Sequence, residues 1–129
     1  MKKVLLIFII FIMIASTLIG CSGNKNTFVF KGQSKSWTMV YTMYVTNNTH
    51  TKSDFNLKYK GTDIKKVGEV NYTINGPTEG QSNQLTLNSQ GESSGNIQLI
   101  GGMPESKLGI NVKIVWNNKQ ELLYLTKEN

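Results

Sequence analysis

Apolar and polar residues alternate along most of the chain after Phe28. This period of two is typical of β-strands whose two faces meet different surroundings. The clearest example is 36–46, where Trp37 and every second residue up to Val45 are apolar or aromatic. The same pattern predicts strands at 53–60, 68–75, 109–116 and 120–126, and shorter ones around Leu85 and Leu87 and around Ile97 and Leu99. With 27–31 expected as a strand at a sheet edge, the pattern predicts seven or eight strands.

Residues that favour turns separate these strands. Asn and Gly tolerate the positive φ that tight turns require, and they occur at Asn47-Asn48, 60–63, 75–77, Gln90-Gly91, Gly101-Gly102 and Asn117-Asn118. We expect the serines and glycines of 76–95 to form hairpin connections. A single helical turn is expected at 63–67.

The fold predicted from this pattern is all-β. Strands with one apolar face must pack that face against a second sheet or close into a barrel. We therefore expect an antiparallel β-sandwich, immunoglobulin-like or fibronectin-III-like, with a small β-barrel as the alternative. Trp37 and Trp116 fall on the inward faces and are expected to anchor the core.

The N-terminus has a different character, because a basic start at Lys2 and Lys3 is followed by an apolar stretch and then small residues. These are the parts of an export signal. Leu18-Ile19-Gly20-Cys21 matches the lipobox of bacterial lipoproteins, which implies diacylglycerol on the sulfur of Cys21 and cleavage before it. Two acyl chains would hold the protein stably on a membrane. A retained transmembrane anchor, or a simple cleaved signal, are the alternatives.

These features divide the chain into a lipoprotein signal peptide (1–20), a lipidated Cys21 with a short tether (21–27) and one β-sandwich domain (28–129). The expected location is the extracytoplasmic face of the cell membrane. The domain is too short for the two-lobed form of solute-delivering lipoproteins. Cys21 is the only cysteine, so no disulfide can stabilise the exported part.

Four segments resemble small, uncharacterised lipoproteins of Bacillus-type Gram-positive bacteria: WTMVY at 37–41, LKYKGTD at 57–63, GEVNYTI at 68–74 and INVKIVWN at 110–117. The similarity covers most of 28–126. It implies the same β fold and the same envelope location, and it transfers no activity.

The charge of the chain is basic, with a formal net charge of +6, and all 14 basic residues are lysine. Nucleic-acid binding would favour arginine forks and a basic stripe with stacking aromatic residues. Because the lysines are scattered, we expect a solvated surface and no nucleic-acid partner.

The sequence predicts no catalytic site, metal site or cofactor. His50 is the only histidine and is expected in a solvated turn, without the converging donors that a metal needs. The acids are expected as solvated charges in turns and at strand ends; they are Asp54, Asp63, Glu69, Glu79, Glu92, Glu105, Glu121 and Glu128.

Some apolar residues fall on the face away from the core. If Asn117-Asn118 forms a two-residue turn, Val112 pairs with Leu123 and Ile110 with Leu125. The opposite face then carries Val115, Leu122 and Tyr124, and Val40 and Tyr44 likewise point away from the core. Exposed apolar clusters often mark contact surfaces, although a slipped register or a covering loop would also explain them.

We therefore expect a non-enzymatic, membrane-anchored lipoprotein that binds or supports another envelope component, with Val115, Leu122 and Tyr124 as its candidate partner-contact face. A small-ligand carrier with a pocket between the sheets is the alternative, and an envelope hydrolase is a third.

Overall fold

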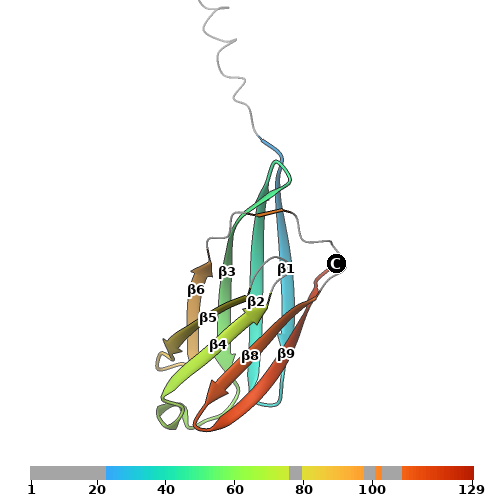
Figure 1. Cartoon of the computed structure of the whole chain (residues 1–129). Helices are drawn as coiled ribbons and strands as arrows, with labels where there is room; N and C mark the ends of the chain where they lie inside the picture. Colours follow the sequence, from blue (N-terminus) through green and yellow to red (C-terminus); the bar gives the residue numbers. More distant parts are fainter. Residues whose placement is uncertain (1–22, 76–79, 98–100, 103–108) are drawn as a thin grey trace, which may run out of the picture.

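Two layers of antiparallel strands cross each other obliquely in the computed structural model, which describes residues 23–75, 80–97, 101–102 and 109–129 (Figure 1). The strands are β1 (Lys25–Gln33), β2 (Trp37–Thr46), β3 (Thr49–Tyr59), β4 (Glu69–Asn75), β5 (Gly80–Thr86), β6 (Glu92–Ile97), β7 (Gly101–Gly102), β8 (Ile110–Trp116) and β9 (Lys119–Lys127). A 3-10 turn, η2 (Ile64–Lys66), lies within the helical turn expected at 63–67.

The strand order is β5-β4-β8-β9-β1-β2-β3-β6, with β7 paired to β3 outside this path. One layer holds β1, β2, β3 and β6, and the other holds β4, β5, β8 and β9. Only two residue pairs, Phe30–Lys127 and Lys31–Thr126, join β1 to β9 and so make the two layers one sheet. The all-β antiparallel prediction is confirmed, in a single, nearly closed sheet that shares features of the sandwich and of the barrel alternative.

The position expected for the first strand was wrong. The sequence placed 27–31 at a sheet edge, whereas β1 begins earlier, at Lys25, and lies between β2 and β9. Phe30 on its inward face is 4% exposed. Alternation within one strand reports which side chains are buried and contains no information on how many neighbours the strand has.

Two expectations about connections were also wrong. Leu85 lies in β5 and Ile97 in β6, as the short strands predicted there require. Both strands begin earlier than predicted, within the polar stretch expected to form connections, and Gly101-Gly102, expected as a turn, forms β7 against Thr49 and His50. Both β5 and β6 end the sheet, where one side of the strand has no partner. Polar composition suits such edges because it discourages pairing with other chains.

Inward side chains from both layers form one core. Trp37 is fully buried and its ring meets that of Trp116 edge-on, with centroids 5.2 Å apart and planes at 82°. The anchoring role predicted for the two tryptophans is therefore confirmed. The buried apolar residues are Phe30, Trp37, Met39, Tyr41, Met43, Val45, Phe55, Leu57, Val67, Val70, Tyr72, Ile74, Ile97, Ile110, Val112, Ile114, Trp116, Leu123 and Leu125.

Candidate interaction surfaces

The β8–β9 hairpin presents apolar side chains on the outside of its layer. Asn117 and Asn118 have φ of 44° and 57°, as a two-residue type I′ turn requires. The turn fixes the register, in which Val112 pairs with Leu123 and Ile110 with Leu125, so the predicted pairing is confirmed.

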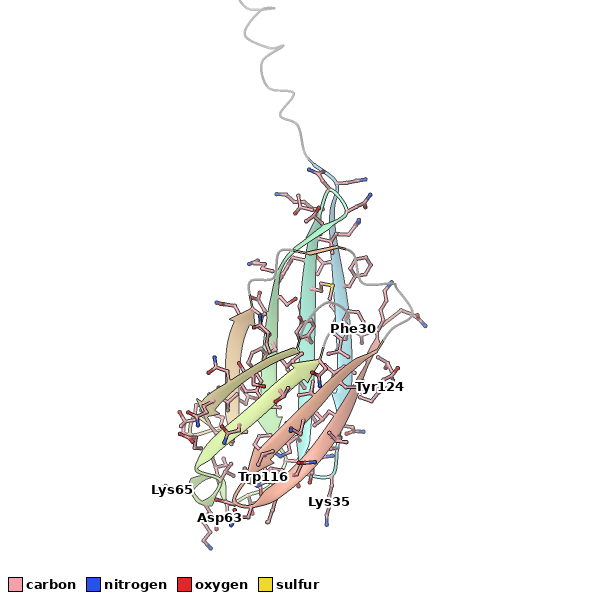
Figure 2. The ribbon with its side chains drawn as sticks, in the orientation of Figure 1. Phe30, Lys35, Asp63, Lys65, Trp116 and Tyr124 are labelled. Carbon is pink, nitrogen blue, oxygen red and sulfur yellow. The ribbon has the colours of Figure 1, made fainter. Side chains whose placement is uncertain are left out.

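The residues between these inward pairs therefore point outward. Leu122 is 67% exposed and Tyr124 57% exposed, while Val115 is half-buried. We call Val115, Leu122 and Tyr124 the β8–β9 face; Tyr124 is labelled in Figure 2. Neither a slipped register nor a covering loop from the described residues removes them from the surface. Their role in binding stays a prediction.

Polar residues surround the β8–β9 face. Lys113 pairs with Leu122, Asn111 with Tyr124 and Gln120 with Val115. On the other side of β8, β4 continues the surface, with Asn71 opposite Val115 and Thr73 opposite Lys113. The polar residues around the apolar centre are Asn71, Thr73, Asn111, Lys113 and Gln120. An apolar centre with a polar, solvated rim is the general composition of protein contact surfaces.

The ring of Tyr124 lies over a glycine. A Cβ built on Gly109 would overlap the phenol ring, so the ring lies directly against the backbone there. The ring contacts Gly109, while Tyr124 as a whole remains exposed. The sequence pattern showed Tyr124 on this face but gave no indication that its ring lies against Gly109.

The outer face of the other layer carries a shallow cavity of about 440 Å³ over β2, β3 and β6. Val40, which is 36% exposed, borders it, and this agrees with its predicted outward direction. Asp54 lines the cavity and accepts a hydrogen bond from Tyr44, which, with partial desolvation, raises the pKa of the Tyr44 hydroxyl. The ammonium of Lys52 lies 4.7 Å from the Tyr44 ring centroid, so one face of that ring is occupied.

A second cluster of polar groups lies where the β1–β2 turn meets β9. The Glu121 carboxylate accepts hydrogen bonds from the hydroxyl of Ser34 and from both the backbone N–H (3.0 Å) and the hydroxyl (2.7 Å) of Ser36. Desolvation alone would raise the pKa of Glu121, but these bonds and the charge of Lys35 outweigh it and hold the pKa below its ordinary value. The cluster ties the two layers together at this end.

The other described acids are dispersed. Lysines lie close to three of them: Asp63 is 3.0 Å from Lys66, Glu92 3.3 Å from Lys58, and Glu128 2.8 Å from Lys31. Glu69 accepts a hydrogen bond from Gln84 instead. Glu79 and Glu105 lie outside the described residues.

His50 lies in strand β3, between Val45 and Gly101, and not in the turn where it was expected. The turn is shorter than expected because Asn47 and Asn48 alone complete it, with φ of 52° and 59°. Within the described ranges, no three His, Cys, Asp or Glu side chains come together as metal ligands would.

Cys21 and the signal expected at 1–20 lie outside the described residues. In the part of the chain that is described, no helix has the length and apolar character needed to cross a membrane. No family model matches the chain, and neither the curated proteins nor the solved structures provide a significant match.

Proposed function

We propose that the chain is a non-enzymatic lipoprotein, attached by diacylglycerol on Cys21 to the extracytoplasmic face of the cell membrane. In this proposal its β domain binds another envelope protein through the β8–β9 face. The sequence alone supports the anchor, because a cysteine directly follows a lipobox at the end of an export signal.

The observation that carries the binding role is the exposure of Leu122 and Tyr124 on the same face of the hairpin that the two-residue turn Asn117-Asn118 closes. Single exposed apolar residues are common, but a contiguous cluster on a regular sheet face is a feature of contact surfaces. Tyrosine is also one of the residue types that contribute most to binding energy at such surfaces.

Two tests address the two parts of the proposal. For the anchor, mass spectrometry of the chain purified from membranes should find diacylglycerol on a mature N-terminal Cys21, and Cys21→Ser should lose both the acyl mass and partition into detergent. For binding, a photo-crosslinking residue is placed at position 122 in intact cells. A matched control carries the same group at Asn96, which is exposed on the other layer.

We expect a discrete cross-linked protein from position 122 and not from position 96. Leu122→Glu, which changes an exposed side chain and should leave the fold intact, should weaken cross-linking from a probe at position 124. Equal capture from both layers would contradict a specific role for this face.

A small-ligand carrier is the second candidate, and the shallow cavity beside Asp54 favours it. That cavity is on the outside of β2, β3 and β6, whereas aromatic and aliphatic side chains fill the space between the layers. A carrier would therefore bind small polar ligands on its surface, and Asp54→Asn would abolish their binding without affecting cross-linking at position 122.

A further inference from the structure

The start of β1 and the β2–β3 turn form one end of the domain. The backbone N–H of Asn47 donates to the carbonyl of Asn24 at 2.9 Å, and Lys25 pairs with Thr46. A Cβ built on Gly23 would lie 2.9 Å from the side-chain oxygen of Asn47, so Gly23 also lies against this turn. Figure 1 shows the first described residues entering at this end, beside the tip of the β2–β3 hairpin.

This end is very close in sequence to the proposed lipid. Ser22 alone separates Gly23 from Cys21. Two residues span at most about 7 Å even when fully extended, so acyl chains on Cys21 would bring the end to the membrane surface. The sequence predicted a tether over 21–27, but the segment before the first strand is shorter because β1 already begins at Lys25.

The charges at this end suit an anionic surface. Lys25 and Lys52 are exposed, and the register places both on the outer face of their layer. We call Gly23–Lys25, Thr46–Thr49 and Lys52 the tether end. The nearest described acid along β3 is Asp54, two residues beyond Lys52, and its carboxylate accepts a hydrogen bond from Tyr44. At the opposite end, the lysines are interspersed with acids, which are Asp63, Glu69, Glu92 and Glu121.

We propose that the tether end rests on anionic phospholipid headgroups and that the domain stands upright on the membrane. This inference rests on the proposed lipid anchor and adds to it a fixed orientation. The nine residues of β1 rise about 3.3 Å each, which would hold the Asn117-Asn118 turn roughly 25–30 Å above the tether end. The β8–β9 face would then lie along the side of the domain, free of the bilayer.

The test uses the acylated full chain, purified from membranes and reconstituted in vesicles of phosphatidylcholine with or without one-third phosphatidylglycerol. Because the sulfur of Cys21 would be blocked by lipid, a new cysteine provides a single labelling position. Thr49→Cys and Gln120→Cys are compared, since both residues are exposed and lie one and two residues after an Asn-Asn turn, at opposite ends of the domain. A fluorophore on each is quenched by lipids with a nitroxide in the headgroup.

We expect several-fold stronger quenching at position 49 than at position 120 in vesicles with phosphatidylglycerol. Each lysine near an anionic surface strengthens contact by about fivefold, so Lys25→Gln with Lys52→Gln should lower quenching at position 49 towards its value in phosphatidylcholine alone. The same decrease should occur on raising the salt concentration.

Each other outcome is decisive. Equal quenching at both positions, in a chain that is acylated and floats with the vesicles, would overturn the orientation and leave the proposed anchor intact. Strong quenching at position 49 that is the same with and without phosphatidylglycerol, and unchanged by Lys25→Gln with Lys52→Gln, would overturn the role of anionic headgroups. A chain without acyl mass on Cys21 that fails to float would overturn the proposed anchor and this inference with it.

Discussion

Gly32 provides a sharp test of how the two layers are joined. It follows Phe30 and Lys31, the two residues of β1 that pair with β9. A Cβ built on Gly32 would lie 2.5 Å from the carbonyl oxygen of Tyr124 and 2.7 Å from a methyl of Leu125. The Tyr124 carbonyl oxygen belongs to the backbone, so it cannot move away by a change of rotamer as a side chain can.

The size of the effect follows from this geometry. Carbon and oxygen atoms of neighbouring strands rarely approach closer than 3.0 Å, so Gly32→Ala must move β1 and β9 apart by about half an ångström at their joint. Forcing an extra methyl into a packed site costs about 1–3 kcal/mol, and an immovable backbone obstacle places this case near 2–3 kcal/mol. In a domain of about 100 residues that corresponds to a decrease in Tm of roughly 10–20 °C.

The assay is denaturant unfolding of Gly32→Ala beside Gly109→Ala. The added methyl at Gly109 would meet the ring of Tyr124, which is exposed and free to rotate away. Gly109→Ala should therefore change the free energy of unfolding by less than about 1 kcal/mol, in part because alanine restricts the unfolded chain. Similar stabilities for the two variants would refute the reasoning that the close approach of β1 and β9 requires glycine.

Other predictions concern the core, the Glu121 cluster and the hairpin turn. Trp116→Ala should lower the free energy of unfolding by about 3–5 kcal/mol, measured by urea denaturation; a loss below 1 kcal/mol would contradict its place in the core. Glu121→Gln should cost about 1–2 kcal/mol at pH 7, whereas the exposed Glu128→Gln should cost less than 0.5 kcal/mol. Because folding lowers the pKa of Glu121, its stabilisation is complete above the unfolded pKa and is lost as the pH falls through the folded value. The difference between Glu121→Gln and the unmodified chain should therefore shrink as the pH falls below the ordinary carboxyl pKa in a pH series of unfolding curves, and a difference that does not change with pH would exclude a charge effect. Asn118→Gly should raise the Tm slightly, because glycine adopts the φ of +57° found there without strain. Asn118→Ala should lower the free energy of unfolding by about 1 kcal/mol, and equal effects of the two substitutions would argue against the type I′ turn.

The local structure could be predicted from the sequence where side chains alternate strongly. The pattern from Trp37 to Val45 gives both the strand and its buried face, because a sheet with one side in the core requires that alternation. Asn117-Asn118 fixed the register of β8 and β9 in the same way, since a two-residue turn allows one pairing.

Strand β6 shows why the bounds of other strands could not be predicted. A short strand was expected around Ile97, but β6 begins at Glu92, and its sequence, ESSGNI, lacks large residues before Ile97 and so resembles a connection. In the structure, Gly95 pairs with Phe55, and a Cβ on Gly95 would lie 2.6 Å from the Phe55 ring. The partner strand thus supplies the apolar group, and the pattern within β6 alone does not reveal it.

Contacts between segments distant in the sequence could not be predicted either. Ser34 and Ser36 bind Glu121 across more than 80 residues of sequence. Each of these residues alone is typical of a solvated surface position, so only the strand order brings them together. The same holds for Gly109 and Tyr124, where the glycine becomes informative only when the ring is seen to cover it.

The strand order also connects the two proposals. β1 begins at the tether end and is the direct neighbour of β9, which carries Leu122 and Tyr124. With the proposed anchor, the height of the β8–β9 face above the membrane would follow from the length of these two adjacent strands. Since Tyr124 faces Gly32, near the far end of β1, a partner would meet this face roughly 20–25 Å above the lipid. A membrane protein with a short extracytoplasmic segment, or a second peripheral protein of similar height, would fit this geometry. A partner confined to the outer cell wall would require the domain to leave the membrane, which the proposed acyl chains on Cys21 would oppose.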